Sequence, residues 1–181
     1  DGKKKLFYSV NAYTHRRPST DSYDWNVNPS VEWKPISTLT LSVGPGYERL
    51  REDAQYLMKQ IDPTATATYG TRNIFGTLDQ TTVSANLRIN VAFTPNLSLQ
   101  MFAQPLVSAG HYTGIKELAR GRSYDFNVYG TGASTFDPAT GMIDPDGPGP
   151  AAPFQLVNED FGLSGNPDFN YKSLRGNAVL R

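Results

Sequence analysis

The sequence contains no cysteine and no excess of charge of either sign. Without cysteine, neither a disulfide nor a thiolate metal site can form. Lys and Arg together number 17, as do Asp and Glu, so the formal net charge is zero. Nucleic-acid binding needs a basic stripe that releases counterions from phosphates. We therefore expect no nucleic-acid partner, and a chain of 181 residues suggests one domain.

Long apolar runs are also lacking, since no stretch approaches the ~18 apolar residues of a membrane helix. The opening residues, DGKKKLFYSV, do not show the succession of initiator Met, charged region and apolar run that marks a signal peptide. The closing residues, SLRGNAVLR, stop within an alternating pattern that has no turn. From these two ends we expect a fragment of a larger mature protein.

Alternation of apolar and polar residues dominates what is present. In TTVSANLRINVAF every second residue from Val83 to Phe93 is apolar, and the residues between them are polar or small. This period of two is the pattern of a β-strand with two unlike faces. Similar patterns predict six long strands, at residues 4–13, 24–34, 38–48, 82–93, 97–106 and 173–181.

The connections between these strands alternate strictly between short and long. VEWKPISTLTLS and VAFTPNLSLQ are near-repeats, in which a proline marks a tight turn. The long connections are residues 14–23, 49–81 and 107–172. Short turns at one end and long loops at the other are typical of outer-membrane barrels. The predicted fold is all-β: an antiparallel up-and-down sheet that is part of an outer-membrane β-barrel with long external loops.

Two of the long connections contain further patterns. YERLREDAQYLMKQ fits either a helix or a strand that rises beyond the membrane and returns as a tall hairpin, and alternation in ATATYGTRNIF favours the hairpin. SYDFNVYG predicts a strand of another external hairpin. Residues 131–170 are dense in Gly, Pro, Asp and Asn, so we expect an irregular external loop there.

Alternation alone fits two environments for the apolar face. In a soluble sheet this face packs on a core, whereas in a membrane barrel it meets lipid. Trp25 and Trp33 lie on one face, and at ~3.3 Å per residue their separation is roughly 26 Å. That spacing suits the two aromatic girdles of a barrel. We expect Trp25, Trp33, Tyr47 and Phe93 to be interface aromatics, and Pro29 to require an edge or a bulge.

The opposite face would then line the lumen of a barrel. An Arg on the lipid side at mid-depth would cost roughly 2–4 kcal/mol, so Arg88 favours the inward side. Whether these polar residues select a solute or cross-link a closed interior stays open. The residues expected to face the lumen are Asn86, Arg88, Asn90, Gln100, Gln104, Arg175 and Asn177.

Signals for chemistry are weak. Asp137, Asp144 and Asp146 are closely spaced carboxylates on a Gly-rich segment, which could bind Ca²⁺ or simply form turns. The histidines, His15 and His111, both lie in expected loops. No nucleophile elbow or dinucleotide motif is present. We therefore expect no cofactor, no catalytic residue and no enzymatic activity in this chain.

Several segments together resemble one protein family. GPGYERLREDAQYL, FGTLDQTTVSANLRINVAFTPNLSLQMFAQPLVSAGHY, KELARGRSYDF and NPDFNYKSLRGNAVLR are similar to the C-terminal barrel of the domain-of-unknown-function family 5916. The resemblance covers nearly the whole chain. It implies a barrel in the bacterial outer membrane, often fused to a carbohydrate-binding module resembling family 9. It implies no reaction, because the activity of the family is unassigned.

The expected function is therefore non-enzymatic anchoring or translocation, linked to surface handling or uptake of glycans or similar ligands. The expected partners are the lipid bilayer, the remaining barrel strands of the parent chain and a glycan ligand. Strand edges at residues 4–13 and 173–181 should be unpaired. The alternatives are a surface enzyme with catalytic residues outside this fragment, and a soluble β-sandwich that serves as a binding module.

Overall fold

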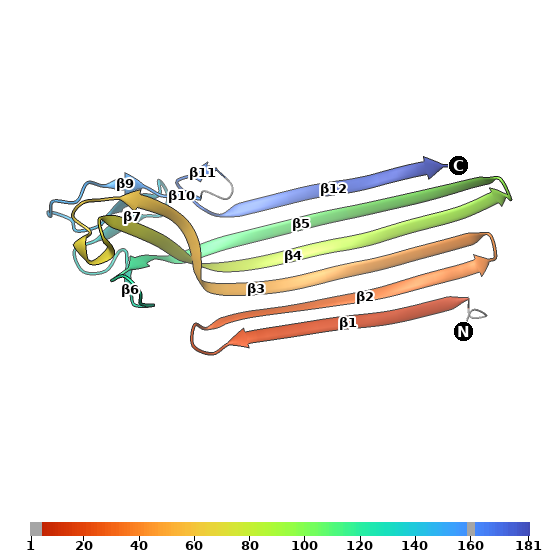
Figure 1. Cartoon of the computed structure of the whole chain (residues 1–181), viewed down its shortest axis with the longest axis horizontal. Helices are drawn as coiled ribbons and strands as arrows, with labels where there is room; N and C mark the ends of the chain where they lie inside the picture. The colour runs from red at the N-terminus through yellow and green to blue at the C-terminus, as the bar shows by residue number, and fades with distance from the viewer. Residues whose placement is uncertain (1–4, 159–161) are drawn as a thin grey trace.

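Six long strands form one antiparallel sheet in the computed structural model, which describes residues 5–158 and 162–181 (Figure 1). In sheet order they are β1 (Leu6–Arg17), β2 (Ser22–Ile36), β3 (Leu39–Ile61), β4 (Thr71–Thr94), β5 (Leu97–Leu118) and β12 (Phe169–Leu180). Each strand pairs with its neighbour in sequence, except that β12 returns to pair with β5. The predicted all-β, up-and-down antiparallel sheet is confirmed.

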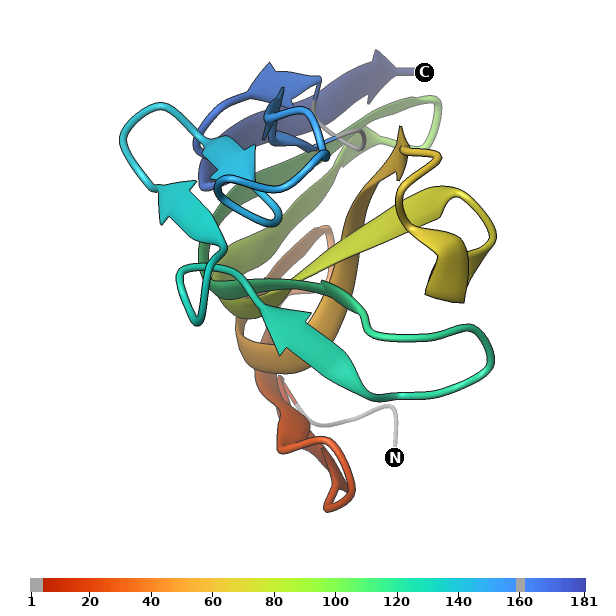
Figure 2. The ribbon, with the colours of Figure 1, turned by 90° about the vertical axis from the view of Figure 1, so that its left-hand side faces the viewer.

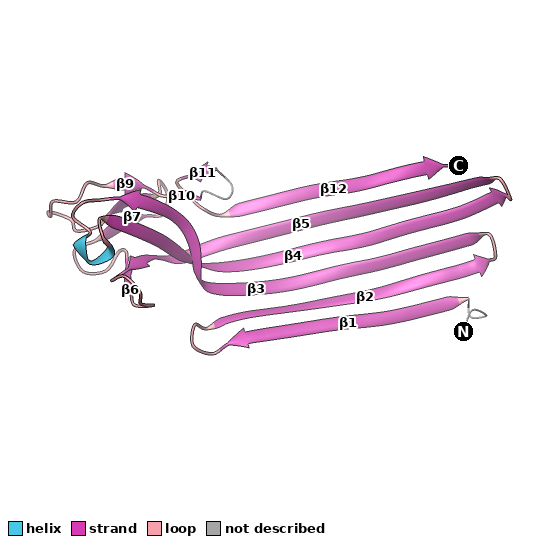
Figure 3. Cartoon of the chain, viewed as in Figure 1, coloured by secondary structure: helices cyan, strands magenta, loops and turns pink. Residues whose placement is uncertain are grey.

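Short elements occupy the connection between β5 and β12. They are β6 (Phe126–Val128), β7 (Thr135–Asp137), β8 (Met142–Asp144), β9 (Phe154–Gln155), β10 (Val157–Asn158) and β11 (Leu163–Ser164). β6 adds to the end of β5, β7–β8–β9 form a small sheet, and β10 pairs with β11. The helical structure in the described part of the chain is one 3₁₀ turn, η1 (Thr66–Thr68), between β3 and β4 (Figure 3).

Strands lie in all six expected stretches, but they are longer than expected. β1 runs on through Arg17 and β2 begins at Ser22, so residues 14–23 are mostly strand, with a tight turn at 18–21. The alternation fades in THRR because both faces are polar there. Residues 49–81 are the tall hairpin of β3 and β4, and the helix alternative is wrong.

The irregular loop expected over residues 131–170 is irregular for most of its described length, but short strands and a buried core interrupt it. Within its described residues it contains β7 to β11 and buries Ile143, Phe154 and Leu156. The expected hairpin strand at SYDFNVYG is present as β6, paired with the end of β5. Turn-forming residues thus connect short strands that pack into a core rather than forming a loop without structure.

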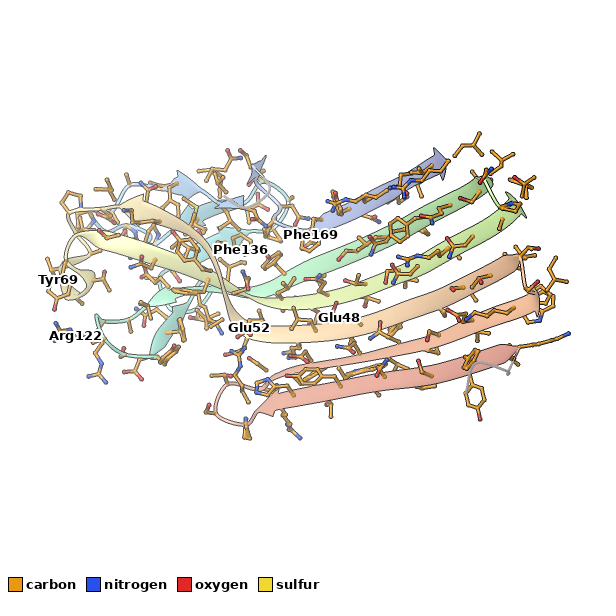
Figure 4. The ribbon with its side chains drawn as sticks, turned by 45° about the vertical axis from the view of Figure 1, so that its right-hand side comes forward. Glu48, Glu52, Tyr69, Arg122, Phe136 and Phe169 are labelled. Carbon is orange, nitrogen blue, oxygen red and sulfur yellow. The ribbon has the colours of Figure 1, made fainter. Side chains whose placement is uncertain are left out.

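The molecule has two zones, which we call the wall and the cap. The wall is the single-layer part of the sheet, residues 6–50, 80–110 and 169–180 (Figures 1 and 4). The cap is the described part of residues 51–79 and 111–168, where the hairpin tips and the short strands gather (Figure 2). Every residue of the hydrophobic core lies in the cap: Leu57, Met58, Ile74, Leu78, Tyr112, Ile115, Tyr129, Ile143, Phe154 and Leu156.

Pro29 lies neither at an edge nor at a bulge. It sits inside β2, opposite Val10 of β1 in an unbroken ladder. On its other side, the ladder to β3 has pairs at Val27–Tyr47 and Val31–Val43 but none between them. The register of β2 against β3 is the same before and after this gap, so the pairing resumes after the proline without a bulge.

Candidate functional site

The register of the strands sorts the side chains of the wall into two unlike faces. Residues that pair directly across an antiparallel ladder lie on the same face, and neighbours along a strand lie on opposite faces. One face, which we call the apolar face, carries aliphatic and aromatic residues along every strand. Its main rows are Trp33, Leu41, Ile89, Met101 and Ala178, then Val31, Val43, Leu87 and Ala103, then Val27, Tyr47, Val83 and Val107.

The apolar face is open to the surroundings. Val83 is 51% exposed and Val43 is 43% exposed, although both are flanked by strands on either side. Packing under a second layer would bury such residues. Among the described residues, no sheet or helix lies over the wall (Figure 4), and many large apolar side chains of this face are exposed.

Aromatic residues lie near both ends of the apolar face. Trp25 and Tyr47 contact each other at the cap end, with ring centroids 5.2 Å apart. Trp33 and Phe93 lie at the other end, and both are about half exposed. The register therefore places Trp25, Trp33 and Tyr47 on the apolar face, and alternation along β4 from Val91 assigns Phe93 to the same face.

Charge begins abruptly at the cap end of this face. Arg49 follows Tyr47 by two residues, and Arg51 follows Arg49. Both arginines bind Asp79 on β4, through N–O contacts of 3.3 Å from Arg49 and 2.6 Å from Arg51. Arg49 pairs directly with Trp25, and Lys172 pairs with Val107, so charge enters the apolar band at its outermost rows, beside the aromatic residues.

The opposite side of the wall, the polar face, carries all seven residues expected to line a lumen. Asn90 pairs with Gln100, and Gln104 pairs with Arg175. Arg88 and Asn177 both pair with Phe102, so they lie in one row across β4, β5 and β12, and Asn86 lies next to this row. The pairings of β4, β5 and β12 therefore keep these residues on one face.

A groove of about 390 Å³ runs along the polar face. Arg88 lies at its side with its guanidinium carbon 5.9 Å from the centre of the Phe102 ring. Sequence analysis missed the part of this groove that β1 and β2 supply, although polar residues alternate along β2 from Asn26 to Glu32. The missed lining residues are Asn11, Asn28, Ser30 and Glu32.

The cap contains a buried ion network centred on Arg72. Its Nε donates to Asp62 Oδ2 (2.6 Å), and its Nη1 donates to both oxygens of Glu117 (2.7 and 2.8 Å). The Tyr129 hydroxyl donates to Glu117 Oε2 (2.9 Å), and Thr64 donates to Asp62 Oδ1 through its amide and hydroxyl. All charges in this network have partners, so it holds the tip of the β3–β4 hairpin against β5.

The ionisation of the network follows from these contacts. Burial opposes the charged form of Asp62, but hydrogen bonds from Thr64 and Arg72 outweigh it and lower the pKa of that carboxyl. Burial would lower the pKa of Arg72, yet its bonds to Asp62 and Glu117 raise it. Burial raises the pKa of Tyr129, and the charge of Glu117 raises it further. Asp62 and Arg72 are therefore charged at neutral pH, with Tyr129 as a neutral donor.

The three aspartates considered for Ca²⁺ do not form a ligand set. Asp137 accepts from the Ala139 amide and the Thr140 hydroxyl, and these bonds lower its pKa. Asp144 accepts from backbone amides of its own turn, and Asp146 accepts from the Ala151 amide. The described residues contain no group of three or more His, Asp or Glu that could hold a metal ion. Plain turn formation therefore accounts for the observed hydrogen bonds.

The two histidines are far apart in the sheet. His15 on β1 faces Asp24, with an N–O distance of 3.9 Å. His111 on β5 donates from Nδ1 to Asp168 (2.6 Å), whose other oxygen accepts from the Tyr112 amide. Each histidine thus pairs with a separate carboxylate, and His111 helps to fix the chain just before β12.

Comparison with known proteins gives no match: no family model, no curated protein and no solved structure is similar to this chain. The resemblance to family 5916 accordingly stays a prediction. No helix in the described part of the chain is long and apolar enough to cross a membrane.

Proposed function

We propose that the wall is part of a transmembrane β-barrel in a bacterial outer membrane, with its apolar face against lipid and its polar face toward a lumen. The observation that carries this proposal is an apolar face with no covering layer among the described residues. Six strands at ~4.8 Å each and a height of roughly 26 Å give this face an area of about 750 Å². The largest apolar patch of a typical soluble monomer covers about 300–600 Å².

The borders of the face support the same proposal. A lipid-facing band of a barrel is about 25 Å tall and is flanked by aromatic girdles. Here Trp25 and Trp33 are eight residues apart, and the charged cluster of Arg49, Arg51 and Asp79 lies at the cap end. The cap, which holds the hydrophobic core, would then stand outside the membrane.

The edges of the sheet require partners on this proposal. Among the described residues, β1 pairs only with β2, and β12 pairs only with β5. An open edge leaves backbone groups unpaired, which is not tolerated in lipid. Further strands of the parent chain would pair with β1 and β12 and close the barrel.

The function proposed for this barrel is non-enzymatic anchoring or translocation, linked to the handling or uptake of glycans or similar ligands at the cell surface. The neutral amides and hydroxyls of the polar face suit solvated, uncharged ligands. The link to glycans comes from the carbohydrate-binding module found beside similar barrels, so it rests on the resemblance alone.

Membrane depth along β4 tests the proposal. Single cysteines would replace Leu87 and Ile89 on the apolar face, and Asn86 and Asn90 on the polar face, in the otherwise cysteine-free protein. In outer-membrane vesicles, fluorophores at 87 and 89 should be quenched by lipid-phase probes, whereas 86 and 90 should react only with aqueous reagents. Aqueous reactivity at all four positions would show a sheet in water and refute the membrane assignment.

Ion conduction separates translocation from anchoring. If the lumen is open, planar bilayers containing the full-length protein should conduct, and Arg88→Glu should shift selectivity toward cations because it reverses a charge on the lumen wall. Thr40→Val, on the same face without charge, is the matched control. A protein that inserts but does not conduct would leave anchoring as its role.

A further inference from the structure

Three prolines lie in one row across the wall, at half its height. Pro29 lies four residues from both Trp25 and Trp33. Extending the register from Val27–Tyr47 and Val31–Val43 places Pro45 of β3 directly opposite Pro29. Pro105 of β5 lies in the same row, because Pro45 pairs with Ala85 and the register of β4 and β5 continues from Ala85 to Pro105.

The prolines interrupt only those ladders toward which their nitrogens point. The β1–β2 ladder is complete at Pro29, and the β3–β4 ladder is complete at Pro45. The nitrogen and carbonyl of each of these two residues therefore point into the space between β2 and β3, where the pairing is missing. Proline has no N–H, so neither can donate to the carbonyl of the other. Two backbone carbonyls are thus left facing each other without ladder partners.

The polar face leaves these carbonyls accessible. Gly44 and Gly46 flank Pro45 on that side, and a Cβ at Gly44 would lie 3.5 Å from the Pro29 oxygen. A Cβ at Gly46 would lie 2.7 Å from Ser84 Oγ and 2.8 Å from Asn28 Oδ1. The missing side chain of Gly44 therefore leaves the Pro29 carbonyl open to the groove of about 390 Å³, which both prolines line, whereas Ser84 and Asn28 fill the space beside the buried Gly46.

The groove around the two carbonyls favours a neutral ligand that donates hydrogen bonds. Carbonyl oxygens and Asn28 Oδ1 are acceptors and need donors. A cation is disfavoured, because Arg88 lines the same groove and no described carboxylate pairs with it. Glu32, which also lines the groove, is engaged by Lys34 at 2.9 Å. Hydroxyl groups remain as donors that carry no charge.

We infer that the gap between Pro29 and Pro45 is a binding site for a hydroxyl-rich neutral molecule such as a sugar, with the two carbonyls as its acceptors. The inference rests on the proposed function in that the polar face is taken as a water-filled lumen. The groove volume lies near the lower end of the roughly 300–1,000 Å³ of small-molecule sites, which suits a ligand of one or two sugar rings.

Restoring the ladder tests the site by removing its acceptors. In the double variant Pro29→Val/Pro45→Val, each valine N–H can bond to the opposite carbonyl, and valine suits a strand. The variant should therefore fold at least as well as the parent. Pro105→Val is the matched control, because it restores an N–H in the β4–β5 ladder of the same row but leaves the Pro29–Pro45 gap unchanged.

Maltose is the probe, titrated into the full-length protein in detergent micelles and followed by the amide signals of Gly44 and Gly46. The parent protein should show saturable shifts, and the double variant should bind at least ~10-fold more weakly, as expected for two lost hydrogen bonds. Pro105→Val should bind within about twofold of the parent. Gly44→Val should also block binding by filling the groove, while Thr40→Val on the same face should not.

Three results would overturn the inference: no binding of maltose by the parent, equal binding by the double variant, or saturation of the same amide shifts by potassium chloride. The depth measurement along β4 keeps the two proposals separate. If 87 and 89 contact lipid but maltose does not bind, the site fails and the barrel stands. If 87 and 89 are in water but binding depends on the proline gap, the membrane assignment fails and the site stands.

Discussion

Replacing Arg72 by methionine should open the cap while leaving the wall intact. The side chain of Arg72 is 10% exposed, and so are those of Asp62 and Glu117. Methionine preserves much of the volume but leaves two carboxylates without their shared counter-charge. Removing one partner of a buried ion pair costs about 3–5 kcal/mol, which corresponds to roughly a hundred- to several-thousand-fold in an opening equilibrium.

Hydrogen–deuterium exchange followed by mass spectrometry measures this opening in the full-length protein. Peptides covering residues 55–61 and 71–78, at the tips of β3 and β4, should lose protection by that factor. A wall peptide covering residues 84–91 should exchange as in the parent. Arg120→Met is the control, because Arg120 pairs with Asp125 at the surface of the same cap, with the two side chains 70% and 57% exposed.

An exposed pair of this kind contributes only about 0–1 kcal/mol, so the control should change protection little. Arg72→Lys should recover only part of the loss, because a point charge cannot bridge two carboxylates as a guanidinium does. Unchanged protection in Arg72→Met, or an equal loss in Arg120→Met, would refute the assignment of the network as the clamp of the cap.

Three further outcomes are expected. Ile89→Arg should reduce the free energy of unfolding in bilayers, measured by urea titration, by roughly 2–4 kcal/mol, and Asn90→Arg should reduce it by far less. Equal reductions by the two variants would contradict the assignment of the two faces. Because folding lowers the pKa of Asp62, the stability that its carboxylate contributes is present above pH 3.8 and is lost as pH falls through the folded pKa. Hydrogen exchange at the tip of the β3–β4 hairpin should show this loss of stability at low pH. Asp62→Asn should abolish this pH dependence. Gly110→Val should destabilise the β5–β12 pairing by about 1–3 kcal/mol, since its Cβ would overlap the ring of Phe169; unchanged exchange in β12 would exclude that contact.

The wall could be predicted from sequence because its pattern is local. Alternation in β4, from Val83 to Phe93, identifies a strand and also assigns its two faces. The two tight turns marked by proline also indicate which strands lie next to each other in the sheet. The extension of β1 through Arg17 was missed because a strand that is polar on both faces has no alternation to detect.

The cap could not be predicted because its core joins residues far apart in the chain. Ile143 and Leu156 are completely buried, yet each stands among turn-forming residues without any periodicity. They belong to the same buried cluster as Leu57 and Ile74 from the distant β3–β4 hairpin. Composition alone therefore indicated a loop where tertiary contacts make a core.

The candidate site was predicted in part for a similar reason. The period of β4 and β5 assigned Arg88 and its neighbours to one face, and the register agrees. The proline gap depends on which residue of β2 lies opposite Pro45, and that is a property of strand register rather than of either strand alone. A sequence pattern identifies the two prolines, but it does not show that they lie opposite each other.

The long connection between β5 and β12 has a consequence for the order in which the strands fold. β4 and β5 are joined by residues 95–96, whereas residues 119–168 separate β5 from β12. Closing the longer loop costs about 3 kcal/mol more in chain entropy. A folded cap offsets this cost, because the contact of His111 with Asp168 brings the start of β12 to its partner. The hairpins and the cap should therefore gain exchange protection first in pulse-labelling experiments, and β12 should join the sheet last; early protection of β12 would contradict this order.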